Sequence, residues 1–331
     1  MSQKPLCVVT HWVHPEIINY LEPHCRLVVN KTRETWPRQI LFDHLKEADA
    51  AMMFMPDWVD AELLDNAPRL KIVGAALKGY DNFDVDALTS RGVWLSYVPD
   101  LLTIPTAELT IALMLALGRH VLPGDKRVRS GAFEGWRPIF YGQGLHGSTV
   151  GIIGLGRLGQ AVAQRLAGWG VKLIGYDIAE LPDERKRELA LAQTDMPTLL
   201  ATADWVVCVS PLTPESKGLL GAAELAAMKP GAFLVNTGRG SCVDEEAVTE
   251  ALEKGHLAGY AADVFAFEDW GLADRPRDVP EALRDPGLRT VFTPHLGSAV
   301  EQVRIDIAME AARNIVDVLC GKAPRNPVNT I

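Results

Sequence analysis

The chain has 331 residues, 48% of them hydrophobic and 23% charged, which is the composition of a soluble globular protein long enough for two domains. Its 33 basic and 42 acidic side chains give a net charge of −9, and without a basic surplus we expect no nucleic-acid binding. Five scattered cysteines lack metal-ligand spacing, so we expect a reduced, cytoplasmic protein with no metal. No segment has the pattern of a signal peptide or a membrane span, and we expect no contact with a membrane.

The N-terminal part of the chain alternates between apolar runs and amphipathic stretches. We predict strands at "LCVVT", "RLVV", "AAMMFM", "LKIVGAAL" and "VWLSYV", and helices between them such as "PEIINYLEPH" and "PRQILFDHLKEA". This alternation is typical of a parallel sheet covered by helices. The next stretch, "PTAELTIALMLALG", predicts a long helix with Pro105 in its first turn, where proline is tolerated.

A second alternating series predicts another parallel sheet. Its strands are expected at "TVGIIG", "VKLIGYD", "WVVCVS", "AFLVN", "GYAADVF" and "TVFTP". The last helix, "SAVEQVRIDIAMEAARNIVDVL", comes after this second sheet is complete. The sequence therefore predicts an α/β protein made of two doubly wound parallel-sheet units.

The second series opens with the pattern G-x-G-x-x-G, formed by Gly154, Gly156 and Gly159 between a strand and an amphipathic helix. The first glycine permits a tight turn, the second lets the backbone approach a pyrophosphate, and the third allows close packing of helix on strand. The N-terminus of the helix then offers N–H groups to the phosphates. The pattern predicts a Rossmann dinucleotide-binding domain.

Asp177 ends the next predicted strand, where a carboxylate can accept hydrogen bonds from the ribose hydroxyls of NAD. It would repel the extra phosphate of NADP, so NAD is the expected cofactor. Arg157, inside the glycine loop, is a cation that can attract that phosphate, and the strictness of the preference stays open.

Three charged residues follow predicted strands of the second sheet: Arg239, Glu268 and His295. Taken singly, each has an ordinary interpretation as a surface or loop residue. All three fall at the carboxyl edge of the sheet, where open parallel sheets bind ligands. There arginine can fix an anion, histidine can move a proton and glutamate can hold the imidazole, so we interpret them as a catalytic set.

With these motifs the chain resembles the D-isomer-specific 2-hydroxyacid dehydrogenases, over essentially its whole length. The resemblance implies a flavodoxin-like substrate domain of residues 1–102 and 298–331, a Rossmann NAD domain of residues 103–297, and a homodimer. It also implies that Arg239, Glu268 and His295 are the catalytic residues. One departure is Ala266, where many relatives have a glutamate.

Lys78 points to a narrower resemblance. It ends the apolar strand "LKIVGAAL", where its ammonium must find either an anion or open water. The segments "ALKGYDNFDVDA", "FMPD", "VPDLLTIPTAEL", "GWRPIFYG" and "HLGSAVEQVR" together resemble the phosphonate (phosphite) dehydrogenases, which oxidise phosphite to phosphate with NAD.

That resemblance implies two sets of binding residues. The substrate contacts are Met55, Lys78, Gly79, Trp136, Tyr141, Arg239, His295 and Arg304. The NAD contacts are Lys78, Thr106, Gly154, Gly156, Arg157, Leu158, Gly159, Asp177, Val209, Ser210, Pro211, Thr237, Gly238, Arg239, Asp263, His295, Gly297 and Ser298.

The predicted reaction is hydride transfer from phosphite to NAD while water attacks phosphorus, with His295 as the general base. Arg239 is the alternative base, although a guanidinium gives up its proton with difficulty. Two other functions stay open. One is an NAD-dependent reductase of glyoxylate, hydroxypyruvate or a similar 2-keto acid, and the other is a binding protein that senses NAD without catalysis.

Overall fold

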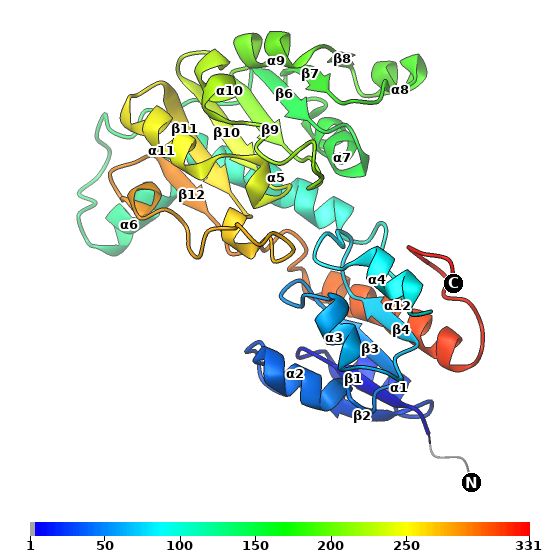
Figure 1. Cartoon of the computed structure of the whole chain (residues 1–331). Helices are drawn as coiled ribbons and strands as arrows, with labels where there is room; N and C mark the ends of the chain where they lie inside the picture. Colours follow the sequence, from blue (N-terminus) through cyan, green and yellow to red (C-terminus); the bar gives the residue numbers. More distant parts are fainter. Residues whose placement is uncertain (1–3) are drawn as a thin grey trace. The chain divides into compact units, whose positions relative to one another are not determined.

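The computed structural model describes residues 4–331 and divides into two compact units (Figure 1). Unit 1 consists of the chain up to Leu102 together with Trp270–Ala273 and Ser298–Ile331. Unit 2 consists of Thr103–Asp269 and Asp274–Gly297. The segment Trp270–Ala273 belongs to unit 1, and no pattern in the sequence predicted this. Within this segment the Gly271 N–H donates to Asn82 Oδ1 at 3.1 Å.

Unit 1 contains a five-stranded parallel sheet with the order β2-β1-β3-β4-β5, which is the flavodoxin-like order. Its strands are β1 Leu6–Val9, β2 Arg26–Val29, β3 Ala50–Met53, β4 Ile72–Ala75 and β5 Trp94–Ser96. Its helices are α1 Pro15–Leu21, α2 Arg38–Leu45, α3 Ala61–Asp65, α4 Val85–Ser90 and the returning α12 Glu301–Leu319.

Helix α12 packs on β3 and β4 from the far end of the sequence. Gly74 in β4 makes this close approach possible, because a Cβ there would lie 2.6 Å from Ile315 Cγ1. The C-terminal helix is therefore part of the core of unit 1.

Unit 2 contains a seven-stranded parallel sheet with the order β12-β11-β10-β9-β6-β7-β8, which is the Rossmann order with one further strand. Its strands are β6 Thr149–Ile153, β7 Lys172–Tyr176, β8 Leu191–Gln193, β9 Trp205–Cys208, β10 Ala232–Asn236, β11 Leu257–Ala262 and β12 Thr290–Phe292. Its α-helices are α5 Thr103–Gly118, α6 Val121–Arg129, α7 Arg157–Leu166, α8 Asp183–Glu188, α9 Met196–Thr202, α10 Ala222–Ala227 and α11 Glu245–Glu253. Three short 3₁₀ turns complete it: η1 Gly240–Cys242, η2 Ala266–Glu268 and η3 Ala282–Arg284.

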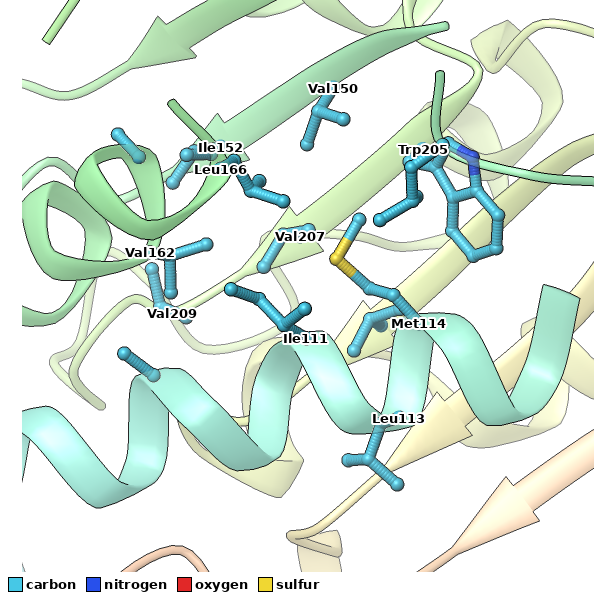
Figure 2. Close-up of a cluster of buried hydrophobic side chains, with 14 of the residues drawn as sticks. Ile111, Leu113, Met114, Val150, Ile152, Val162, Leu166, Trp205, Val207 and Val209 are labelled. Carbon is cyan, nitrogen blue, oxygen red and sulfur yellow. The ribbon is translucent and has the colours of Figure 1, made fainter. Parts of the chain in front are cut away.

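The central strands of unit 2 are buried along nearly their whole length, as expected for a parallel sheet covered on both faces. Figure 2 shows part of one apolar cluster, in which Ile111 and Met114 of α5 lie with Val150, Val207 and Trp205 of the sheet. This packing fixes α5 against the strands that carry the predicted site.

The prediction of two doubly wound parallel-sheet units is confirmed. The edge strand β8 was not predicted, because its sequence, "LAQ", forms no apolar run and is only partly buried. Within residues 4–331, no helix is long and apolar enough to cross a membrane. Within the same residues, no group of three or more acidic, histidine or cysteine side chains could hold a metal ion.

Candidate active site

The glycine loop joins β6 to α7, as the sequence predicts. Gly154 has a φ of +94°, a conformation that other residues rarely adopt. A Cβ on Gly159 would lie 1.9 Å from Gly154 O, so only glycine allows α7 to pack this closely. A Cβ on Gly156, the N-cap of α7, would meet nothing within 4 Å. The loop therefore leaves open space beside a helix N-terminus, which suits a pyrophosphate.

Asp177 follows β7 and turns toward the glycine loop. Its Oδ2 accepts a hydrogen bond from the Leu155 N–H at 2.6 Å, and its Oδ1 accepts one from the Ala179 N–H at 2.9 Å. The next side chain, Ile178, is 95% exposed. The carboxylate is thus held beside the loop, at the place where a ribose acceptor is required.

His295 and Glu268 form a pair at the carboxyl edge of the unit 2 sheet. His295 Nδ1 lies 2.9 Å from Glu268 Oε2, and Glu268 Oε1 accepts the Phe265 N–H at 2.9 Å. Both side chains are partly exposed. With Nδ1 directed at the carboxylate, Nε2 is the ring atom available for proton transfer.

Asp263 holds the loop that carries His295. Its Oδ1 accepts hydrogen bonds from Thr293 Oγ1 at 2.6 Å and from the Leu296 N–H at 2.7 Å, and its Oδ2 accepts the Gly297 N–H at 2.8 Å. The side chain is 1% exposed, and burial raises its pKa. The sequence placed Asp263 among the cofactor contacts and did not indicate this second role.

Arg239 lies in the loop after β10, close to two other backbone segments. The Arg239 carbonyl accepts a hydrogen bond from Asn236 Nδ2 at 2.9 Å. A Cβ on Gly238 would lie 2.5 Å from Ser210 O, and a Cβ on Gly240 would lie 1.9 Å from the carbonyl carbon of Phe265. The two glycines around Arg239 therefore let its loop press directly against neighbouring main chain.

The first half of α5 brings further predicted cofactor residues together. Thr110 Oγ1 lies 2.8 Å from Thr237 Oγ1, at the end of β10. A Cβ on Gly297 would lie 2.9 Å from Thr106 Oγ1 and 3.2 Å from Asp263 Oδ2. Thr106, Thr237 and Gly297 thus meet around the carboxyl ends of β10 and β11, together with Thr110, which no pattern in the sequence had indicated.

The remaining predicted cofactor residues lie in the same part of the fold. Val209 and Ser210 are buried in the turn after β9, Pro211 follows them at the surface, and Leu158 packs on the apolar core from α7. Arg157 is exposed at the first position of α7.

The predicted substrate residues fall in both units. Met55 follows β3, Lys78 and Gly79 follow β4, and all three are half-buried in unit 1. Arg304 belongs to the first turns of α12, where its Nη1 donates to Ser298 Oγ at 3.2 Å. Burial lowers the pKa of Arg304 from its ordinary value, which still leaves a guanidinium charged.

Trp136 and Tyr141 lie in unit 2, in the irregular segment after α6. Their side chains are 77% and 76% exposed. Their contribution to substrate binding stays a prediction.

Glu245 is a buried acidic residue that the sequence analysis missed. It begins α11 and is 5% exposed, and its Oε1 accepts the Ala266 N–H at 2.8 Å. Burial raises its pKa to about 7. Nothing local distinguishes it from an ordinary acidic residue in the first turn of a helix, because only the fold decides its burial.

The sheet order, the glycine loop and Asp177 place unit 2 in the class of dinucleotide-binding dehydrogenase domains. Residues 111–297 match the model described as "D-isomer specific 2-hydroxyacid dehydrogenase, NAD binding domain". The chain belongs to this family, and its cofactor is NAD.

Named relatives and solved structures support the membership of the chain in this family. The chain is 38% identical to a glyoxylate reductase of Thermococcus litoralis, over 98% of this chain and 97% of the relative. The crystal structure of a Thermus thermophilus protein superposes with a TM-score of 0.87 at 35% identity, covering 98% of this chain and 100% of that one. An NADPH-dependent glyoxylate/hydroxypyruvate reductase of Sinorhizobium meliloti, solved with NADP and malonate, gives a TM-score of 0.84 at 27% identity and coverages of 98% and 97%.

Proposed function

We propose that this enzyme oxidises a small anionic substrate by hydride transfer to NAD, with His295 moving the proton. The observation that carries the proposal is the 2.9 Å contact between His295 Nδ1 and Glu268 Oε2. A histidine oriented by a carboxylate at the ligand-binding edge of a Rossmann sheet is a suitable general acid or base. A protein that only sensed NAD would have no need of this pair.

We propose phosphite as the substrate. Unit 1 carries two cationic side chains among the predicted substrate residues, Lys78 after β4 and Arg304 in α12, and both are half-buried. Phosphite near neutral pH approaches a dianion and carries more charge in less volume than a 2-hydroxy acid. Charge-assisted hydrogen bonds from such cations would offset the cost of removing it from water.

The proposed reaction assigns one task to each residue. Bound NAD supplies the hydride acceptor for the P–H electron pair. His295 Nε2 takes a proton from the water whose oxygen forms the new P–O bond, while Glu268 holds the imidazole through Nδ1. Arg239 binds the phosphite oxygens as their charge redistributes. The products are phosphate, NADH and the proton on His295.

Reduction of glyoxylate or hydroxypyruvate is the second candidate, and the names of the relatives favour it. The Thermococcus litoralis and Sinorhizobium meliloti relatives are named as reductases of these acids. The same residues would serve, with Arg239 binding the carboxylate and protonated His295 donating to the carbonyl oxygen.

One assay separates the two candidates. NADH formation from NAD and phosphite is compared with NADH consumption by glyoxylate and by hydroxypyruvate, on the same preparation. Phosphite oxidation with a kcat/KM well above that for either acid supports the first proposal. Turnover of the acids without phosphite oxidation selects the second, and binding of NAD without either reaction would select the sensing protein.

We also propose that the enzyme is a homodimer. The segment from α6 to Tyr141 exposes a series of large apolar side chains: Val121, Leu122, Val128, Phe133, Trp136, Ile139, Phe140 and Tyr141. An exposed apolar surface of this kind is typical of a protein interface. Light scattering on the purified protein tests this, and a monomer at micromolar concentration contradicts it. The cytoplasmic location and the lack of nucleic-acid and membrane partners stay predictions.

A further inference from the structure

Glu245 is buried, which is unusual for an acidic residue in the first turn of a helix. Its neighbour Asp244 already caps α11, accepting the N–H groups of Glu246 and Ala247 at 3.1 Å. Glu245 points inward instead and is 5% exposed. Its Oε1 accepts the Ala266 N–H at 2.8 Å, while its Oε2 is buried and has no hydrogen-bond partner within the described part of the chain. A buried oxygen without a hydrogen-bond partner destabilises a fold. Because Asp244 already caps the helix, capping does not explain why Glu245 is buried.

The Ala266 N–H that Glu245 Oε1 accepts belongs to the same short turn as Glu268, the partner of His295. Ala266 begins η2, the short turn that ends at Glu268. In the same turn the Phe265 N–H donates to Glu268 Oε1 at 2.9 Å, and Glu268 Oε2 lies 2.9 Å from His295 Nδ1. A continuous series of hydrogen bonds and main chain therefore joins Glu245 to His295.

The turn has little freedom to move on its other side. A Cβ on Gly240 would lie 1.9 Å from the carbonyl carbon of Phe265 and 2.1 Å from Ala266 N. The Arg239 loop therefore packs against the peptide whose N–H Glu245 accepts. Displacement of this peptide would disturb both the arginine and the glutamate of the catalytic set.

The charges around Glu245 favour its neutral form. Burial is the largest cause that raises its pKa to about 7, and the neighbouring carboxylates Asp269, Glu268 and Glu246 raise it further, against the effect of the Ala266 N–H. Tyr260 also lies close enough to interact with it and is itself buried. Below neutral pH, therefore, Glu245 adds no second negative charge next to Glu268.

We propose that Glu245 is a positioning residue for the His295–Glu268 pair. Its carboxyl group fixes the Ala266 peptide and thereby the direction of Glu268, and its protonation state sets the charge that His295 meets. The inference rests on the proposed role of His295 in proton transfer.

The test uses two substitutions at Glu245 and a matched control. Glu245→Gln keeps an acceptor for the Ala266 N–H but cannot ionise, and Glu245→Met keeps the approximate volume without the acceptor. Glu253→Gln removes an exposed carboxylate from the last turn of the same helix, α11. Melting temperatures of all variants confirm that each is folded.

The expected results separate the two parts of the role. Glu245→Met lowers kcat about tenfold with the KM for NAD within about twofold, because misplaced catalytic groups slow the chemistry and not cofactor binding. Glu245→Gln restores kcat to within about twofold of wild type and moves the midpoint of the pH profile of substrate oxidation to lower pH by about 0.3 unit or more. Glu253→Gln leaves kcat and the midpoint unchanged.

A second readout needs no substrate. The imidazole of His295 is titrated by ¹³C NMR, and its signal is assigned because it is missing from His295→Asn. In Glu245→Gln the midpoint of this titration should also move to lower pH. If Glu245→Met keeps wild-type kcat, or if the midpoint is the same in wild type and Glu245→Gln, Glu245 does not position the pair. If the wild type oxidises neither phosphite nor a hydroxy acid, the proposed function fails, while the NMR titration still decides the role of Glu245.

Discussion

Asp263 accepts the Leu296 and Gly297 N–H groups on either side of its carboxylate, and its own carbonyl accepts the His295 N–H at 2.8 Å. His295 adopts a φ of 55°, a left-handed conformation that is uncommon for residues other than glycine. A buried aspartate at the end of β11 therefore holds the histidine loop in a strained conformation. Backbone strain that is kept in place by several hydrogen bonds is typical of a functional residue.

Replacing His295 by asparagine tests the proton-transfer role. We expect kcat to fall by at least about a hundredfold, because proton transfer by a positioned side chain contributes a factor of this order. The affinity for NAD should stay within about twofold, since the glycine loop lies on other strands. Calorimetric titration with NAD and steady-state kinetics measure both, and a variant with more than about a tenth of wild-type kcat would remove His295 from this role.

Asp177→Ala should weaken NAD binding and raise the ratio of NADP to NAD efficiency by about tenfold, the effect of losing one charge-assisted hydrogen bond. Because Asp177 also accepts the Leu155 N–H, Asp177→Asn is the matched variant that keeps an acceptor beside the glycine loop. Asp183→Ala, an exposed carboxylate in α8, controls for loss of charge alone. An unchanged cofactor preference in Asp177→Ala would show that the ribose contact lies elsewhere.

Lys78→Ala should raise the KM for phosphite by about tenfold or more, since a desolvated anion loses one charge-assisted partner on the order of 1.5–3 kcal/mol. Competitive inhibition by sulfite, which resembles phosphite in size and charge, should weaken in parallel. Arg304→Ala should act in the same direction but more mildly. Lys71→Ala, an exposed lysine of unit 1 that pairs with Asp49, should change neither value. If KM and sulfite inhibition stay within about twofold in Lys78→Ala, the lysine binds no anion and faces water.

Gly240→Ala should lose most activity and several degrees of melting temperature, because the added methyl group meets the Phe265–Ala266 peptide at about 2 Å. Gly124→Ala in α6 is the matched control, since a Cβ there meets nothing within 4 Å. Alanine is favoured over glycine inside a helix, so the control should be neutral or slightly stabilising. Kinetics and thermal unfolding of both variants test this, and wild-type activity in Gly240→Ala would show that the turn can shift without harm.

The pKa of Glu245 predicts how stability depends on pH. Its folded-state pKa of about 7 lies above the ordinary value of 4.5, so between these values the folded state holds a proton that the unfolded state has released. The free energy of unfolding should therefore fall as pH rises from about 4.5 to about 7 and be unaffected by this group above that. The loss is on the order of 3 kcal/mol, and Glu245→Gln should remove it. Urea unfolding of both proteins at several pH values measures the difference, and parallel curves contradict the prediction.

The sequence by itself determined the two parallel sheets and the edge at which the proposed catalytic set lies. The glycine loop, Asp177, Arg239 and His295 were all visible, because a parallel sheet brings the carboxyl ends of its strands to one edge wherever they stand in the sequence. Glycine patterns and apolar runs are local signals, and they survive in a single sequence without any knowledge of packing.

Only the tertiary structure decided which polar groups are buried and what supports the site. Glu245 looks like a first-turn acid and Asp263 like a cofactor contact, yet each holds main chain beside Glu268 or His295. Gly240 looks like a loop glycine, yet its lack of a side chain lets the Phe265–Ala266 peptide pack against it. The hydrogen-bond partners of the two acids, Glu245 and Asp263, lie between 21 and 34 residues away in the sequence. Contacts of this kind arise when separate elements pack together and exclude water, so no local pattern of residues announces them.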